Sequence, residues 1–180
     1  DASHTSRYNC LSLGQDSWVI HRALGAAEVP LSAYLVTNGQ GVKPLVPAGR
    51  YWGRVIGVSG STVFIRTSQV ADRYGIIALD MKTSFGKIIL HERPNEVLVQ
   101  AQMIGQRLVL QYLDLDLNNI LRITDLDGTT LKEYSPHDLG FSDRGTFSLL
   151  SGNSSTDLVS QFTYSSMFDK PTTLELSLLD

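Results

Sequence analysis

The sequence predicts an all-β fold, a β-propeller of about four blades of antiparallel sheet, on three observations. Short runs rich in β-branched and aromatic residues fill the chain, and turn signals separate them. The runs recur in similar groups with a period in the forties. A long apolar stripe with helical spacing is missing. The best helical candidate, Ala23 to Val29, contains Gly25 and is followed by Pro30.

The predicted strands are read from composition, and the turns from glycine and asparagine pairs. The clearest strand runs are Thr62–Thr67, Tyr74–Leu79, Leu108–Tyr112 and Leu158–Tyr164. The clearest turn signals are Asn38-Gly39, Ser59-Gly60, Asp127-Gly128 and Ser151-Gly152-Asn153.

The runs form four similar units, with predicted blades at residues 1–45, 46–92, 93–138 and 139–180. The strands expected in them are 17–21 and 33–39; 53–58, 62–67 and 76–80; 97–101, 107–112 and 120–125; and 146–150, 158–164 and 173–177. Thr37, Asp80 and Asp125 occupy matching places after the third strand, 43 and then 45 positions apart. A sheet has two faces to bury, and neighbouring blades cover them. A β-sandwich or barrel with similar hairpin spacing remains the alternative at this point.

Composition limits the class of protein. Hydrophobic residues make up 42% and charged residues 18%, which fits a globular domain. The net charge of −3 and the scattered basic residues argue against a nucleic-acid surface. The single cysteine, Cys10, excludes an internal disulfide and favours a reducing compartment; we expect it to be a small buried residue of a strand. No Cys or His spacing resembles a zinc site, so neither metal nor cofactor is expected.

Targeting and membrane signals are also missing from the sequence. No apolar stretch of about 18 residues is present, and no signal-peptide pattern opens the chain. We therefore expect a cytoplasmic protein. The start at Asp1 and the strand-like pattern running into Asp180 indicate a piece of a longer chain.

Candidate chemistry is sparse. Gly57-Val58-Ser59-Gly60-Ser61 approaches a nucleophile elbow but lacks the final glycine, and it is expected in a hairpin. A second pattern, Asp114-Leu115-Asp116-Leu117-Asn118, resembles the start of a calcium loop. Asn119 stands where such a loop needs a turn glycine, and the alternating leucines suit a strand. We therefore expect these polar residues at the mouth of a hairpin. Seven aromatic residues are expected in the core between blades: Tyr51, Trp52, Phe64, Tyr112, Phe147, Phe162 and Tyr164.

The order of local patterns from Tyr51 to Asp180 resembles the later blades of the propeller domain of the prolyl oligopeptidase family, and earlier residues match more loosely. The matching stretches are Gly60–Ser68, Arg73–Asp80, Leu108–Asp114, Asn119–Gly128, Ser160–Ser166 and Pro171–Leu174. The resemblance implies a seven-bladed propeller stacked on an α/β-hydrolase domain that carries a Ser-Asp-His triad and cleaves after proline. This chain would then be about four of the seven blades, the C-terminal ones, with no catalytic residue of its own.

The resemblance also implies a function and partners. The propeller would gate access of short proline-containing peptides to the hydrolase domain of the parent chain. The family places an arginine on the propeller face over the active site, and Arg22 lies near that place. Its surroundings, His21-Arg22-Ala23-Leu24-Gly25, match loosely, and a solvated surface arginine is the alternative.

Two other functions stay open. The chain could be a free-standing small propeller that serves as a protein-interaction scaffold. A peptidase acting alone is disfavoured by the missing elbow. In a partial ring, the two end blades would expose apolar faces, so self-association through them is expected.

Overall fold

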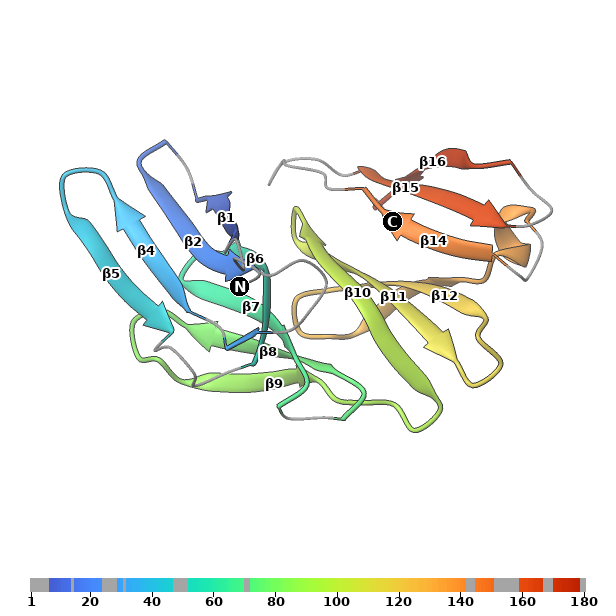
Figure 1. The fold of residues 1–180 in the computed structure, drawn as a ribbon, viewed down its shortest axis with the longest axis horizontal. Coiled ribbons are helices and arrows are strands. Elements are labelled where there is room, and N and C mark those ends of the chain that lie inside the picture. Colours follow the sequence, from blue (N-terminus) through green and yellow to red (C-terminus); the bar gives the residue numbers. More distant parts are fainter. Residues whose placement is uncertain are drawn as a thin grey trace, which may run out of the picture. The chain divides into compact units, whose positions relative to one another are not determined.

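The computed structural model describes residues 7–13, 15–23, 29–30, 32–46, 52–69, 72–141, 145–150, 159–166 and 170–178. The chain divides into two compact units, Asp1–His91 and Glu92–Asp180. Each unit contains two antiparallel sheets (Figure 1).

The first unit has one four-stranded and one five-stranded sheet. The first sheet has the order β1-β2-β4-β5, with β1 Arg7–Ser12, β2 Ser17–Ala23, β4 Ala33–Thr37 and β5 Gly41–Val46. The second has the order β3-β6-β7-β8-β9, with β3 Val29–Pro30, β6 Trp52–Ser59, β7 Thr62–Thr67, β8 Gly75–Asp80 and β9 Gly86–Leu90. Apart from β3, each strand pairs with the strand beside it along the chain, so short turns fix the topology.

The second unit repeats this arrangement. The third sheet has the order β10-β11-β12-β13, with β10 Glu96–Ile104, β11 Arg107–Asp114, β12 Asn119–Thr124 and β13 Thr130–Tyr134. A 3-10 turn, η1 (His137–Leu139), leads to the fourth sheet, which has the order β14-β15-β16. These strands are β14 Gly145–Leu149, β15 Val159–Ser166 and β16 Thr172–Ser177.

The predicted strands are confirmed, and the structure adds β1, β3, β5, β9 and β13, which lie outside the predicted ranges. The turn η1 is the only helical element in the ranges described above. The helical candidate Ala23–Val29 begins in β2 and ends in β3, and what lies between is outside the described residues. The strand β1 was not predicted, because Asn9 interrupts its apolar residues.

The repeated polar residue lies at the end of one strand in each of the first three sheets: β4, β8 and β12. Asp80 is the last residue of β8; its carboxylate accepts the backbone N–H groups of Lys82 (2.9 Å) and Thr83 (2.7 Å). Asp125 follows β12 and accepts the N–H groups of two residues of the next turn at 3.0 and 2.8 Å. Thr37 ends β4 and accepts from Gln40 through its carbonyl. An Asx turn needs a short side-chain acceptor at its first position, which explains the repeated aspartate.

Apolar side chains from both sheets fill the core of the first unit. Val19 and Ala33 from the first sheet and Val63 and Ile65 from the second belong to one buried cluster. Residues at alternate positions share a face of a strand, so one face of each sheet supplies this core. The two sheets are therefore held by face-to-face packing.

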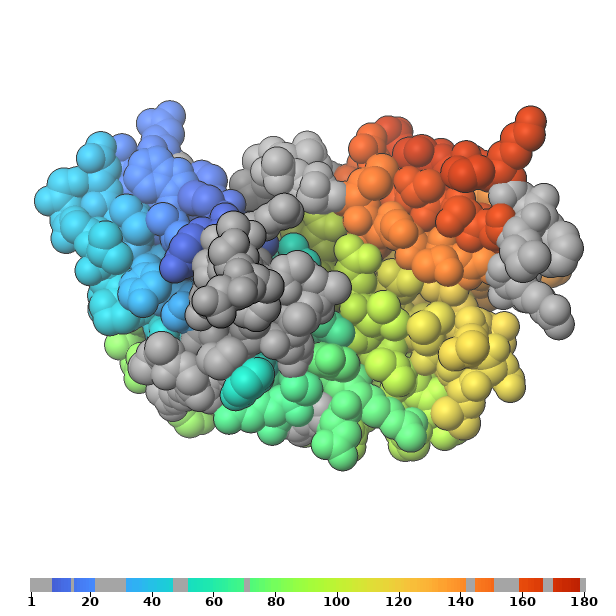
Figure 2. All heavy atoms as spheres, in the orientation of Figure 1, coloured from blue at the N-terminus to red at the C-terminus, as the bar shows by residue number. Residues whose placement is uncertain are grey.

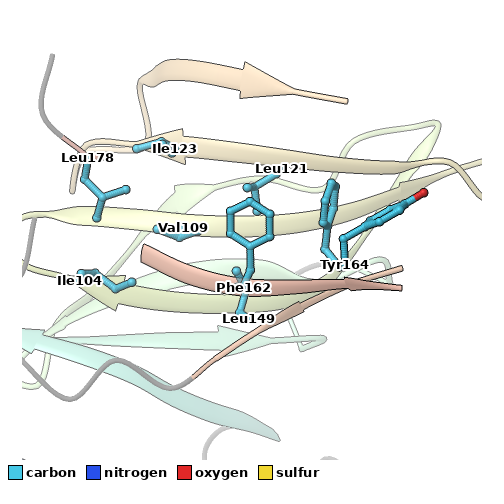
Figure 3. Packing of buried hydrophobic residues seen from close by; sticks show 9 residues of the cluster. Ile104, Val109, Leu121, Ile123, Leu149, Phe162, Tyr164 and Leu178 are labelled. Carbon is cyan, nitrogen blue, oxygen red and sulfur yellow. The ribbon is translucent and has the colours of Figure 1, made fainter. Parts of the chain in front are cut away.

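The core of the second unit combines aromatic and aliphatic side chains. Phe147 and Phe162 meet edge to face with ring centroids 5.3 Å apart, and Tyr164 is 5.2 Å from Phe147. These rings from the fourth sheet share a buried cluster with Leu121 and Val109 of the third sheet (Figure 3). Burial of these three rings together with the aliphatic side chains of the cluster stabilises this unit.

The predicted aromatic core is right for five of the seven residues: Phe64, Tyr112, Phe147, Phe162 and Tyr164 are buried. Trp52 is 47% exposed, so its prediction was wrong, and Tyr51 lies outside the described residues. Cys10 was also predicted wrongly: it is exposed on β1. The next residue, Leu11, packs on the buried cluster, so Cys10 points to the opposite face of the sheet.

We expect Phe162→Ala to lower the free energy of unfolding by about 3–5 kcal/mol, because it leaves a cavity between two sheets. Val159→Ala on the same strand is the control: Val159 is 42% exposed, and its change should stay within about 0.5 kcal/mol. Urea unfolding followed by circular dichroism measures both. Equal effects of the two variants would contradict this account of the core.

Candidate functional site

The predicted substrate-binding residue, Arg22, lies near the end of β2, where its Cα is paired with that of Tyr8. Its side chain is outside the described part of the structure. The role of Arg22 therefore remains a prediction.

Ser59 has the hairpin position that the sequence predicts. It is the last residue of β6, and Gly60-Ser61 connects it to β7. Gly60 has φ of 55°, a left-handed conformation suited to a tight turn between two strands. A nucleophile elbow needs a strand followed by a helix, so Ser59 lacks the backbone geometry of an activated serine.

The third sheet carries a hollow of about 450 Å³ at one end. The β11–β12 turn and the segment after β13 lie at the same end because successive strands run in opposite directions. Side chains of these two segments and of the adjoining strand ends line the hollow: Asp114, Asn118, Asn119, Ile120, Glu133, Ser135 and Asp138. We call it the Asp114 hollow.

Asp114 organises the first wall of the hollow. Its carboxylate accepts the backbone N–H groups of Asp116 (2.9 Å) and Asn118 (2.8 Å), and the Asn118 amide donates to it at 3.0 Å. The hydrogen bonds from Asn118, first through its side chain, hold the pKa of the Asp114 carboxyl below its usual value. The polar hairpin mouth is thus confirmed, but Leu115 and Leu117, predicted to suit a strand, lie exposed in the turn.

The second wall is a turn closed by Ser135 and Asp138. The Asp138 carboxylate accepts the backbone N–H of Ser135 at 2.8 Å, and the Ser135 hydroxyl also donates to it at 2.8 Å. The backbone hydrogen bond from Ser135 is the largest cause of the lowered pKa of Asp138. An activated serine needs a base such as histidine beside its hydroxyl, and His137 is close in sequence. The Ser135 hydroxyl instead donates to the Asp138 carboxylate, an arrangement that anchors a turn.

Asn119 connects the hollow to the fourth sheet. It is buried, accepts the Gln111 amide at 2.8 Å and donates to the carbonyl oxygen of Gly145. Gly145 is needed there, because a Cβ at this position would overlap the ring of Tyr164. Phe141 stacks on the same ring with centroids 4.3 Å apart. The floor of the hollow is therefore fixed by packing between two sheets.

Glu133 belongs to a charged cluster that includes a buried arginine. The guanidinium of Arg122 contacts Glu133 on one side and Glu96 on the other, with Nη2 2.7 Å from Oε1 of Glu96. It also lies 4.8 Å from the centre of the Tyr112 ring. Burial lowers the pKa of Arg122, but the two carboxylates outweigh it and the pKa is raised. Arg122 is therefore a permanent cation that holds three strands of one sheet together.

The chemistry available in the Asp114 hollow is that of binding. Three of its seven lining residues are acidic and none is basic, so it favours ligands with N–H donors or positive charge. Asp114 and Asp138 already accept hydrogen bonds within turns, and Glu133 is already paired with Arg122; because Glu133 is 51% exposed, it is the carboxylate that a ligand could share. Within the described ranges, no three His, Cys, Asp or Glu side chains are grouped closely enough to hold a metal ion.

Part of this site is predicted by the sequence analysis. It singled out Asp114 and Asn118 as polar residues at a hairpin mouth. Glu133, Ser135 and Asp138 were missed, because nothing in their spacing connects them to a turn about twenty positions earlier. A search for Ser-x-x-Asp, the reciprocal cap found at Ser135 and Asp138, would have found one of the missing turns.

Comparison with known proteins identifies the fold. No family model and no curated protein sequence matches the chain. Solved structures match it along nearly its full length. A structure from a study of two prolyl endopeptidases has 17% identity and a TM-score of 0.73, and the match covers 97% of this chain and 25% of that one.

Prolyl oligopeptidase B from Galerina marginata gives the same result in two forms. The apo protein has 16% identity, a TM-score of 0.72 and coverage of 99% of this chain and 26% of that one. A mutant bound to a 35mer substrate has 16% identity, a TM-score of 0.74 and coverage of 100% and 26%. The fold is thus that of a β-propeller fragment of a prolyl oligopeptidase, as the sequence patterns predict. The chain spans about a quarter of the length of these proteins.

We expect Gly145→Ala to lower the free energy of unfolding by about 1–3 kcal/mol, because the added methyl group must displace the Tyr164 ring. Thr146→Ala, at the exposed neighbouring position, should change it by less than about 0.5 kcal/mol. Thermal and urea unfolding compare the two variants. A neutral Gly145→Ala would show that the ring has room to move.

The Glu96–Arg122 pair should make stability depend on pH. The hydrogen bond from Arg122 lowers the pKa of Glu96 from its ordinary 4.5, so the pair stabilises the fold fully above that value. The contribution is lost as pH falls through the lower, folded-state pKa. Unfolding by urea between pH 7 and pH 2 should therefore show a smaller acid-induced loss in Glu96→Gln than in the wild type.

The matched control for this titration is Glu92→Gln, which removes a carboxylate at an exposed position of the same unit. If the Glu96–Arg122 pair stabilises the fold, Glu96→Gln should change the pH dependence of the free energy of unfolding more than Glu92→Gln does. Parallel curves for the wild type and Glu96→Gln would refute the assignment.

Proposed function

We propose that this chain is the non-catalytic propeller domain of a prolyl-oligopeptidase-like serine peptidase. In this role it gates the access of short proline-containing peptides to a hydrolase domain elsewhere in the parent protein. The single observation that carries the proposal is the fold match to prolyl oligopeptidases along 97–100% of the chain. The positions of Ser59 and Ser135, each used in a turn, are consistent with catalysis being supplied by another domain.

The proposed mechanism is steric. Propeller blades surround a channel, and a channel of fixed width admits an extended peptide but not a folded domain. Rigid walls are required for this selection, and the paired sheets with their buried clusters supply them. Closing the active site also excludes water from the reaction.

Arg22 is the residue proposed to contact the peptide. A guanidinium can donate to a peptide carbonyl or carboxylate in a fixed geometry. The resemblance to the family supports this role, and the position of Arg22 near the end of β2 is compatible with it. The partners are the hydrolase domain and short peptides, and the compartment proposed is the cytoplasm. Among the described residues, no helix is long and apolar enough to cross a membrane.

A second candidate is an interaction scaffold that needs no hydrolase domain. The Asp114 hollow favours it, since an acidic concavity lined by a single sheet and its turns can bind a basic ligand by itself. A scaffold of this kind would function without any peptidase activity in the parent protein.

The test uses the full-length gene product and a chromogenic substrate that ends in Gly-Pro-nitroanilide. We expect hydrolysis of this substrate and of short proline-containing peptides, and no cleavage of folded proteins. Arg22→Ala should raise KM about 10-fold or more, the cost of one charged hydrogen bond, with a smaller effect on kcat. Arg54→Ala, at an exposed position of β6, is the matched control and should leave both constants unchanged.

Three outcomes bear on the proposal. Hydrolysis of peptides alone supports gating, and equal cleavage of folded proteins contradicts it. A gene product without any peptidase activity would leave the scaffold as the better account. If Arg22→Ala behaves as Arg54→Ala does, the arginine is a solvated surface residue.

A further inference from the structure

The turn between β4 and β5 contains the only Asn-Gly pair of the sequence, Asn38-Gly39. Residues 38–40 connect Thr37, the last residue of β4, to Gly41, the first of β5, and the Cα atoms of Thr37 and Gly41 are paired. In Figure 2 the β4–β5 hairpin, in cyan, lies at the surface of the first unit. A neighbouring propeller blade packs on the face of a sheet, whereas this turn lies at the end of one.

An asparagine followed by glycine can react with its own backbone. The backbone nitrogen of Gly39 attacks Cγ of Asn38 and loses its proton to water, and the Cγ–Nδ2 bond breaks as the amide nitrogen takes up a proton and leaves as ammonia. Water then opens the cyclic imide at either carbonyl, which gives aspartate or isoaspartate. The reaction consumes one water, releases one ammonia and needs no other reagent. Because it is intramolecular, its rate depends on how freely the two atoms approach.

The atoms of this turn are open to that approach. Gly39 has no Cβ beside its attacking nitrogen, and its φ is 71°. The N–H of Gln40 donates to the carbonyl of Thr37 at 3.0 Å, but within the described part of the first unit no hydrogen bond engages the N–H of Gly39. The Asn38 amide donates to the Asp16 carboxylate at 3.4 Å, a long hydrogen bond that holds the leaving group weakly.

Asn95 provides a contrast within the same chain. It also lies at an exposed position in a turn, just before β10. The following residue, Glu96, has a Cβ, and its N–H donates to the carbonyl of Arg93 at 3.3 Å. Cyclisation at Asn95 must therefore break a hydrogen bond and pass a side chain, and neither obstacle exists at Asn38.

We propose that Asn38 is a site of spontaneous deamidation, and that its isoaspartate product displaces β5 from its register. In isoaspartate the main chain runs through the former side-chain carbonyl, so the turn gains one backbone carbon. A short turn fixes the register of the two strands that it connects. Leu45 and Val46 of β5 are buried in the core cluster of the first unit, so a displaced β5 disturbs their packing.

The charge of the product acts in the same direction. The backbone N–H of Asn38 donates to the Asp16 carbonyl at 2.8 Å, so the two residues are held close together. Either product replaces the neutral amide of residue 38 by a carboxylate beside that of Asp16. A donor to Asp16 thus becomes a like charge, which weakens the contact between the two turns.

The first experiment measures deamidation in the full-length gene product, folded and in urea, at neutral and at mildly alkaline pH. Peptide mass spectrometry follows the replacement of NH2 by OH, and chromatography separates the two products. In the folded protein Asn38 should react about 10-fold or more faster than Asn95. The rate should rise with pH, because the attacking nitrogen must lose its proton.

Two variants test the geometry. Gly39→Ala places a Cβ in open space, with no atom within 4 Å, and should slow the reaction about 10-fold or more. Asn38→Gln keeps an amide but lengthens the side chain by one carbon, and it should be unreactive over the same time. Equal rates at Asn38 and Asn95, no effect of Gly39→Ala, or reaction of Asn38 in urea alone would each overturn the proposed site.

The second experiment tests the register by hydrogen exchange. Backbone amides of β5 should exchange faster in the isoaspartate product than in Asn38→Asp, which adds the charge without lengthening the turn. Amides of β9, the last strand of the second sheet, are the control and should exchange equally in both. Equal exchange of β5 in the two forms would overturn the proposed displacement. No reading uses peptidase activity, so this modification and the gating function can fail separately.

Discussion

Burial of sheet faces is the constraint on which this structure depends. An antiparallel sheet made of alternating apolar and polar residues needs another sheet against its apolar face, since its own hydrogen bonds run only within its plane. Each unit meets this requirement with two sheets and one shared cluster. The first cluster contains Val, Ile, Leu and Ala, and the second combines three aromatic rings with Ile, Val and Leu side chains. Short turns can then connect the strands without contributing to the core.

The turns must also serve the burial of sheet faces, because the next strand has to return in register for its apolar side chains to face the core. Asp80, Asp114 and Asp125 each accept backbone N–H groups just after a strand, so the chain reverses within a few residues and the next strand returns in register. Where two such turns lie at one end of a sheet, the side chains between them form a hollow. Asn119 and Gly145 fix its floor. The Asn119 amide of the third sheet donates to the carbonyl oxygen of Gly145 in the fourth, and only glycine leaves room there for the ring of Tyr164. The site is thus a by-product of sheet packing.

The sequence predicted what depends on local pattern. Strands such as β7 and β11 combine high β propensity with clear turns, and the polar residue after the third strand recurs with the repeat. It did not predict what depends on distant neighbours. Trp52 has the residue type of a core position but lies exposed at the start of β6. Cys10 is exposed because it points away from the buried cluster on which its neighbour Leu11 packs. Arg122, Glu96 and Glu133 come from three different strands, so the spacing of residues within one strand could not predict that they form a cluster.

A fold of this kind tolerates extensive change of sequence, which explains how 16–17% identity coexists with TM-scores of 0.72–0.74. Each sheet requires apolar residues at alternate positions and an acceptor at the tight turns, and several residue types satisfy the first requirement. Binding surfaces are different, because they lie on turns and outer faces that the core does not constrain. The acidic lining of the Asp114 hollow is therefore a feature of this chain, and the shared fold does not require it.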